Sequence, residues 1–287
     1  MSGEPLVLYA RPGSDLMAFI ETIDELDLDA DSWALIGGIA VFTRTGSEHR
    51  GTLDIDTLTR DADQLIEVLK SHGGEPLKAH SFALGTTKVD VMEVGEPLLA
   101  GQGSELQVAF ALARRFAFDT ATVETVSIRG PDGLELASTT LPIATPAALI
   151  ALKAVSMPDR LMKHRDATQY AKSTSDAIDL IALAGSSPLE RLAVALATAP
   201  PALQRWVADT LMKSFDTDLS QTVVRLSMAG NKIGVSRDVW SKENLSRVAT
   251  LGYVIDDQLQ LSGGSQVNEA PQSRTDLGPE VSDGREL

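Results

Sequence analysis

Cysteine is absent from this chain and histidine is scarce. Without cysteine, the protein has no disulfide bond, no zinc–thiolate site and no thiol nucleophile, which excludes the folds and enzymes that depend on them. The histidines are scattered along the sequence, at His49, His72, His80 and His164. We therefore do not expect a histidine-rich metal site.

Long hydrophobic runs are also missing. The apolar run at residues 146–155 is interrupted by Lys153 and is shorter than the roughly 20 residues that a membrane-spanning helix needs. The first residues contain neither a basic start nor a long apolar stretch, which predicts no signal peptide. We expect a soluble cytoplasmic protein with no membrane partner.

Basic residues are in deficit, with 25 Lys and Arg against 40 Asp and Glu, for a net charge of −15. Such an acidic surface repels phosphate backbones, so a nucleic-acid substrate would need a local basic patch. One basic cluster consists of Arg160, Lys163, His164, Arg165 and Lys172. It has two explanations. The cluster either binds a triphosphate or an RNA acceptor end, or it is an ordinary charged helix face.

The order of hydrophobic patterns predicts a mixed α/β domain followed by helices. We expect helices at residues 14–26, 61–72 and 104–116, and strands at 33–36, 52–58, 80–84, 87–94, 122–129 and 134–141. From Thr145 the pattern is helical to about residue 228, and the last residues are rich in Gly, Ser and charge. We predict a core domain at 1–144, a helical domain at 145–261 and a disordered tail at 262–287.

Three aspartates carry the strongest chemical signal. Asp54 and Asp56 alternate with Ile55 in an expected strand, so they project from one face, roughly 7 Å apart. Their repulsion needs an offsetting cation or hydrogen bonds, and magnesium prefers such oxygen ligands together with substrate phosphates. Asp90, between Val89 and Val91 on another expected strand, would supply a third carboxylate for a metal clamp.

Gly37 and Gly38 stand where an expected strand gives way to an expected helix. Backbone N–H groups at such a junction can approach a phosphate closely, and the helix N-terminus favours negative charge. A Gly-Gly pair is more often a plain turn, and an Asp-x-Asp pair is more often solvated. The combination of glycines and carboxylates, in this order, nevertheless favours phosphoryl or nucleotidyl transfer.

The same features resemble the nucleotidyltransferase superfamily related to DNA polymerase β. The segments ALIGGIAVF and RGTLDID resemble its AbiEii/AbiGii branch and the related MenT toxins of bacterial toxin–antitoxin systems. Arg50, Thr52, Asp54 and Asp56 match the branch's Arg-x-Ser/Thr-x-Asp-h-Asp segment. TPAALIALK, residues 145–153, and DAIDL, residues 176–180, resemble two further helices of the family, although Ser175 stands where a basic residue is common.

The resemblance implies a nucleotidyltransferase fold and an enzyme that transfers NMP from an NTP. Asp54, Asp56 and Asp90 would hold Mg²⁺ or Mn²⁺, with Asp90 as a second-metal ligand or as the general base. Gly37, Gly38, Arg50 and Thr52 would bind the nucleotide, Lys153 would contact the triphosphate, and Asp176 would position the nucleotide or this lysine. The resemblance also implies a growth-arresting toxin, tRNA as the acceptor and a cognate antitoxin.

Two alternatives stay open. One is a small-molecule nucleotidyltransferase of the aminoglycoside-modifying type, because an acidic surface attracts a cationic acceptor. The other is a catalytically inactive binding module. Retention of two adjacent aspartates at an electrostatic cost argues against the inactive module.

Overall fold

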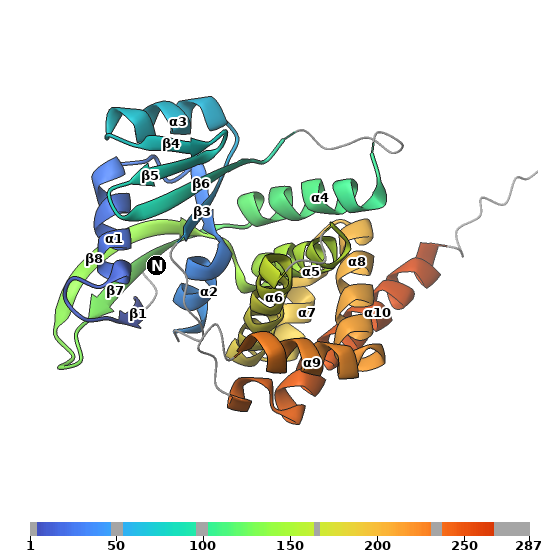
Figure 1. The fold of residues 1–287 in the computed structure, drawn as a ribbon. Coiled ribbons are helices and arrows are strands. Elements are labelled where there is room, and N and C mark those ends of the chain that lie inside the picture. Colours follow the sequence, from blue (N-terminus) through green and yellow to red (C-terminus); the bar gives the residue numbers. More distant parts are fainter. Residues whose placement is uncertain (1–4, 47–53, 96–102, 164–166, 231–236, 267–287) are drawn as a thin grey trace, which may run out of the picture.

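The computed structural model describes residues 5–46, 54–95, 103–163, 167–230 and 237–266. The strands lie on one side of the molecule and the helices of the second half of the chain on the other (Figure 1). The strands, with helices between them, form the first part of the chain, and the second part is helical. The predicted mixed α/β architecture followed by helices is confirmed.

The first part alternates strands and helices. Its elements are β1 (Leu6–Tyr9), α1 (Asp15–Leu26), β2 (Trp33–Ile36), α2 (Gly37–Thr45), β3 (Asp54–Thr59), α3 (Ala62–Ser71), β4 (Glu75–Lys78), β5 (Ser81–Leu84), β6 (Thr87–Glu93), α4 (Glu105–Asp119), β7 (Thr122–Arg129) and β8 (Glu135–Ile143). Asp61 caps α3 by accepting a hydrogen bond from the Gln64 amide at 2.9 Å, and Ser104 and Gln107 form a capping box at α4. These caps explain why polar residues mark where the two helices begin.

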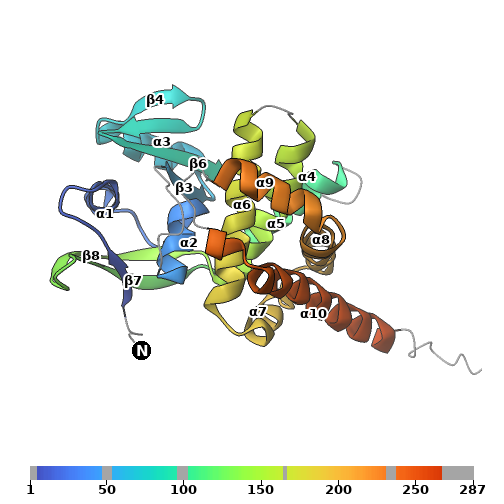
Figure 2. The ribbon, with the colours of Figure 1, turned by 60° about the horizontal axis from the view of Figure 1, so that its bottom comes forward.

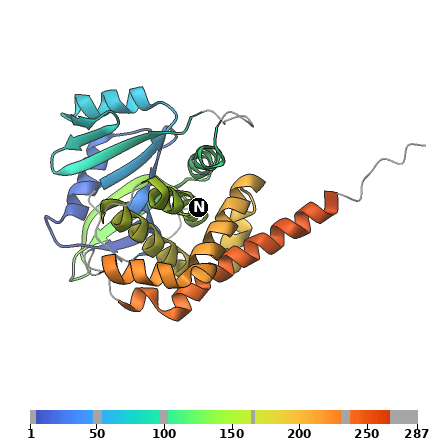
Figure 3. The same cartoon turned by 45° about the vertical axis from the view of Figure 1, so that its right-hand side comes forward.

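The second part begins with a long helical pair. Its elements are α5 (Pro146–Lys163), α6 (Ala167–Ser186), α7 (Leu189–Leu196), α8 (Pro201–Met212), the π-helical η1 (Lys213–Thr217), α9 (Leu219–Gly230), the 3₁₀ helix η2 (Arg237–Trp240) and α10 (Lys242–Gln266). α10 packs on α8, α6 and α7, and its C-terminal end projects beyond the other helices (Figure 3). None of the described helices is both long and apolar enough to cross a bilayer.

The described strands form one eight-stranded sheet in the order β1-β7-β8-β2-β3-β6-β5-β4. Three neighbouring pairs are parallel (β1 with β7, β2 with β8, and β3 with β6), and the other pairs are antiparallel. β2 and β3 therefore lie in the middle of the sheet. Residues of β2 and β3 such as Leu35 and Ile55 are buried in the same hydrophobic core as Leu149 of α5 and Ile178 of α6.

α2 connects the sheet to the helical part. It contacts β2 and β3 on one side and α5 and α6 on the other, and Figure 2 shows it between the strands and α6. Apart from Arg44 and Thr45, its residues are buried. The core is therefore continuous from the sheet to the helices, and the domain division at residues 144 and 145 stays a prediction.

Arg44 fastens the C-terminal end of α2. Its guanidinium donates to the backbone oxygens of Ala144 at 3.0 Å and Ile143 at 2.6 Å, and to the Glu124 carboxylate at 2.7 Å. Burial alone would raise the pKa of Glu124, but the hydrogen bonds from Arg44 and Thr122 lower it overall. Arg44 thus holds α2 against the junction between β8 and α5.

Two short edge strands and the end of α10 differ from the sequence expectations. β1 and β4 were not predicted, because the segment LVLY is short and all four residues of β4 are exposed and include Pro76. We expected a tail from residue 262, but α10 continues to Gln266, since each residue added to a formed helix gains a backbone hydrogen bond at little nucleation cost. Residues 267–287 lie outside the described part.

Replacing Arg44 with methionine (Arg44→Met) should lower the free energy of unfolding by about 2–4 kcal/mol, because Glu124 and two backbone carbonyls lose a charged donor. Urea denaturation measures this change. The matched control is Arg60→Met, since Arg60 is 66% exposed and pairs with Asp119 at the surface, and it should cost less than about 1 kcal/mol. Equal losses for the two variants would contradict the role given to Arg44.

Candidate active site

The register between β3 and β6 brings the predicted carboxylates together. The two strands are parallel, with Asp54 paired to Lys88 and Asp56 paired to Asp90. Paired residues in neighbouring strands project from the same face, and so do residues two apart in one strand. Asp54, Asp56 and Asp90 therefore lie on one face of adjacent strands, together with Lys88.

Lys88 joins two of these carboxylates. Its ammonium nitrogen lies 2.9 Å from Asp54 Oδ2 and 2.5 Å from Asp90 Oδ2. Burial alone would lower the pKa of Lys88, but its hydrogen bonds to Asp90 and Asp54 raise it overall. Sequence reasoning missed Lys88, although its position two residues before Asp90 already placed it on the same strand face.

Asp90 has a second partner from the next strand. Ser81, paired with Asp90 across β5 and β6, donates its hydroxyl to Asp90 Oδ1. Both oxygens of Asp90 therefore have donors, one from Ser81 and one from Lys88. This arrangement holds the carboxylate in a defined orientation on the sheet face.

Gly37 lies directly against Asp56. It is the first residue of α2 and has φ of +75°, a conformation that residues with a side chain rarely adopt. A Cβ at this position would lie 1.9 Å from Asp56 Oδ2. The close approach of backbone and carboxylate therefore requires glycine, and it places the Gly37-Gly38 junction beside the aspartates.

Asp56 is partly buried, and its charged form is disfavoured. Burial raises its pKa to about 6, with further upward contributions from Asp90 and Asp54, whereas Lys153 and Lys88 act in the opposite direction. Loss of hydration on burial is therefore the main reason that the charged form of Asp56 is disfavoured, and the two lysines offset it only in part. An additional cation next to Asp56 would favour the charged form.

Lys153 forms a buried ionic group with two aspartates of α6. Its ammonium nitrogen lies 3.1 Å from Asp176 Oδ1 and 2.7 Å from Asp179 Oδ2. Both aspartates are 0% exposed, and Ser156 donates to Asp176 Oδ2 at 2.9 Å. Sequence reasoning selected Asp176 only, yet the spacing of three residues also put Asp179 on the same helix face.

The donor set of the sheet face suits a hard cation. Asp54 and Asp90 already share one cation, the Lys88 ammonium, which stands where a metal ion would be shared. Among the residues that the structure describes, no group of three or more His, Asp or Glu side chains stands ready to hold a metal ion. The carboxylates are ligands of the type that a hard cation takes, but Lys88 bridges two of them.

Several predicted residues lie outside the described part. Arg50 and Thr52 belong to the undescribed segment 47–53, and the side chains of the basic cluster from Arg160 to Arg165 are not described either. Lys172, the last member of that cluster, is exposed on α6. The roles of all these residues stay predictions.

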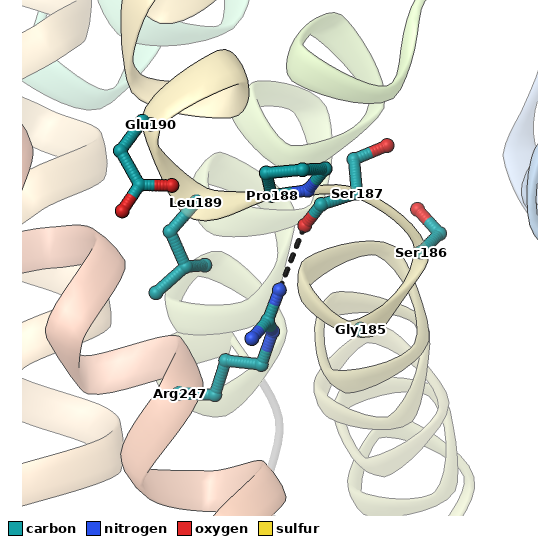
Figure 4. Close-up of a pocket in the computed structure, with 7 residues that line it drawn as sticks. All are labelled: Gly185, Ser186, Ser187, Pro188, Leu189, Glu190 and Arg247. Atoms are coloured by element: carbon teal, nitrogen blue, oxygen red, sulfur yellow. Dashed lines mark hydrogen bonds between the residues drawn. The ribbon is translucent and has the colours of Figure 1, made fainter.

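A surface hollow at the end of α6 contains none of the predicted residues. It is lined by residues 185–190 and Arg247, and Figure 4 shows the Arg247 guanidinium pointing toward the loop between α6 and α7. Arg247 donates to the backbone oxygens of Ala184 at 2.6 Å and Ser187 at 2.8 Å. A cation that satisfies carbonyls at a helix C-terminus is a structural cap.

Residues 21–224, more than half of the chain, match the family described as nucleotidyl transferase AbiEii toxin of type IV toxin–antitoxin systems. No curated protein matches the chain significantly.

Among solved structures, the chain is similar to JHP933 of Helicobacter pylori, with 13% identity, a TM-score of 0.46 and coverage of 90% of this chain and 98% of the other. An antigenic nucleotidyltransferase-like protein of Paracoccidioides brasiliensis shows 20% identity and a TM-score of 0.40, over 72% and 89% of the two chains. The antibiotic-resistance factor ANT(2'')-Ia shows 14% identity and a TM-score of 0.36, over 64% and 88%.

Replacing Gly37 with alanine (Gly37→Ala) should lower the free energy of unfolding by at least about 3 kcal/mol, because it adds a steric clash to backbone strain. Gly46 ends the same helix with φ of +66°, but a Cβ there meets nothing within 4 Å. Gly46→Ala should therefore cost only about 1 kcal/mol from strain. Urea denaturation of both variants tests the difference, and similar costs would argue against the contact between Gly37 and Asp56.

Replacing Asp56 with asparagine (Asp56→Asn) should stabilise the metal-free protein at alkaline pH. Because the folded-state pKa of about 6 lies above the model value of 3.8, protonation of Asp56 favours folding at low pH, and this contribution is lost as the pH rises through about 6. Asp56→Asn should raise the free energy of unfolding by about 1–3 kcal/mol at about pH 8, and the gain should shrink toward about pH 4.

Urea unfolding in a metal chelator at both pH values measures this gain. The control is Asp257→Asn on the exposed side of α10, which should change the free energy of unfolding by less than about 0.5 kcal/mol. A gain for Asp56→Asn that does not depend on pH would show that the charge of Asp56 is not its cause.

Proposed function

Because the chain belongs to the AbiEii nucleotidyltransferase toxin family, we propose that it transfers a nucleoside monophosphate from an NTP to an acceptor hydroxyl on the face formed by β3 and β6. The observation that carries this proposal is the registered pairing of Asp54 and Asp56 with Lys88 and Asp90, next to the Gly37 junction. Phosphoryl chemistry consists largely of positioning and charge neutralisation, and this face concentrates the groups for both.

Asp54, Asp56 and Asp90 are the residues that would hold Mg²⁺ or Mn²⁺. A metal ion held by these carboxylates would supply positive charge to neutralise the negative charge that develops during transfer. The support is the oxygen-only donor set and the cation that Asp54 and Asp90 already share. Metal dependence is our proposal from this chemistry.

The nucleotide's triphosphate would lie at the start of α2. Gly37 and Gly38 present backbone without side chains at a helix N-terminus, which favours anionic groups, and Arg50 and Thr52 would add contacts by the family pattern. Lys153 would neutralise phosphate charge, since its ammonium already acts on Asp56 across the site. Asp176, together with Asp179, holds the Lys153 ammonium in place.

Asp90 would act as the general base or as a second metal ligand. As the base, it takes the proton of the acceptor hydroxyl while the hydroxyl oxygen forms a bond to the α-phosphorus. The bond between the α-phosphorus and the bridging oxygen breaks, and that oxygen leaves with pyrophosphate. The hydrogen bond from Ser81 to Asp90 Oδ1 orients Asp90 for either role.

Membership of this family supports the interpretation that the protein is a toxin and that a cognate antitoxin is its regulatory partner. We propose tRNA as the acceptor and the cytoplasm as the site of action, since both NTPs and tRNA are found there. The net charge of −15 restricts RNA contact to a local basic surface, for which the cluster from Arg160 to Lys172 is the candidate.

The same negative charge favours a second candidate. A cationic small molecule such as an aminoglycoside would be attracted to this surface without any basic patch. An inactive binding module is the third candidate, but retention of Asp54 and Asp56 on one strand face at an electrostatic cost argues against it.

Incubation of the purified protein with Mg²⁺, radiolabelled NTPs and total tRNA should label the RNA. Asp54→Ala should lower the rate at least about 100-fold, or about 3 kcal/mol of transition-state stabilisation, whereas Asp257→Ala on α10 should retain the wild-type rate. Label on an aminoglycoside but not on RNA would favour the second candidate. Absence of magnesium-dependent NTP binding would indicate the inactive module.

Induced expression gives the corresponding test in cells. The wild-type protein should arrest growth, and Asp54→Ala should not, at matched protein levels. Equal toxicity of the two proteins would refute a catalytic origin of the arrest.

A further inference from the structure

Lys88 occupies the position where the proposed reaction would place a divalent metal ion. Its ammonium bridges Asp54 Oδ2 at 2.9 Å and Asp90 Oδ2 at 2.5 Å, and these are two of the three carboxylates that we assign to the metal. A divalent ion shared by these two carboxylates would have to approach the same oxygens. The ammonium and the metal ion cannot both take that place, because two cations in contact repel each other strongly in a partly dehydrated site.

The surroundings of Lys88 permit it to move. Its side chain is 34% exposed, compared with 9% for Lys153. A lysine has a flexible stem of four carbons and a compact charge that can be hydrated at many positions. Lys88 can therefore leave the carboxylates toward solvent, whereas Lys153 is enclosed between α5 and α6 with both aspartates buried around it.

The two lysines thus differ in their relation to the carboxylates. Lys153 is neutralised mainly by its own buried partners, Asp176 and Asp179, and acts on Asp56 from a fixed place. Lys88 is held by Asp54 and Asp90 alone among the salt bridges of the described residues. Removal of Lys88 from its place is therefore coupled directly to occupation of these two carboxylates by another cation.

We propose that Lys88 is an internal competitor of the catalytic metal: it bridges Asp54 and Asp90 and must be displaced for a divalent cation to bind. This inference rests on the proposed function, since it concerns the same metal site. Lys88 thereby lowers the affinity of Asp54 and Asp90 for a divalent cation.

Binding of Mn²⁺ alone tests the competition without any catalytic readout. Isothermal titration at constant pH should show that Lys88→Met binds Mn²⁺ at least about ten-fold more tightly than the wild type, because the competing ammonium is gone. Lys70→Met removes the same charge from an exposed position on α3 and should bind Mn²⁺ like the wild type. Lys88→Arg keeps a cation and should show no gain in affinity.

Two further measurements keep the test decisive. Circular dichroism establishes that each variant is folded, and Lys88→Gln replaces Lys88→Met if the apolar side chain prevents folding. Mn²⁺ should raise the melting temperature of the neutral variant more than that of the wild type, since two neighbouring carboxylates regain a shared cation. Addition of Asp54→Ala to the neutral variant should abolish its gain in Mn²⁺ affinity.

The outcomes separate this inference from the function on which it rests. If the wild type binds Mn²⁺ through Asp54 as tightly as the neutral variant does, Lys88 does not compete and the inference is wrong, while the metal site stands. If neither protein binds Mn²⁺ at millimolar concentration, the proposed metal site fails, and the inference fails with it.

Discussion

The compensation of negative charge on one face of the central strands is the constraint on which this site depends. Three carboxylates from β3 and β6 lie together, and carboxylates at this spacing repel one another unless cations are near. Lys88 bridges two of them directly, and Lys153 acts on Asp56 from the helical side. Burial nevertheless raises the pKa of Asp56, so its charged form stays disfavoured. A further cation on this face would stabilise that charge.

The geometry that supports this face is built into α2. The absence of a side chain at Gly37 lets the helix begin in contact with Asp56, and Arg44 ties the other end of the helix to the β8–α5 junction. Helices α5 and α6 pack on α2 and contribute Lys153 and its two aspartates. The sheet and the helical part therefore meet at the site. The sheet supplies the three carboxylates and Lys88, and the helical part supplies Lys153 with its two aspartates.

Membership of the AbiEii nucleotidyltransferase family defines the reaction class. The aspartates and lysines of the site are the groups that we propose to carry it out. The acidic surface does not select the acceptor in the same way, because it repels RNA in general and attracts small cations. Under our proposal, acceptor choice depends on local charge, and the basic cluster that starts at Arg160 and the segment with Arg50 are its candidates in the sequence.

The sequence by itself determined the local features of the site. Alternation at Asp54-Ile55-Asp56 was sufficient to put the two aspartates on one strand face, because side-chain direction in a strand has a period of two residues. Alternation at Val89-Asp90-Val91 put Asp90 on the face opposite the two valines. The diglycine after an apolar strand predicted where α2 begins, and the central strands, α1, α3 and the hairpins were predicted within a few residues. The family resemblance, confirmed by the match over residues 21–224, added Lys153 and Asp176. Their catalytic roles stay predictions.

Only the tertiary structure decided which of these features meet. The parallel register of β3 with β6 depends on hydrogen bonds between distant segments, which no local pattern encodes, and it created the bridge of Lys88 between Asp54 and Asp90. The packing of α5 on α6 likewise made Asp179 an equal partner of Lys153. Edge strands such as β4 escaped prediction because their residues are exposed and carry no hydrophobic alternation. Periodicity reports the direction of a side chain relative to its own backbone, whereas a site depends on distances between backbones, and those follow from the packing of the whole chain.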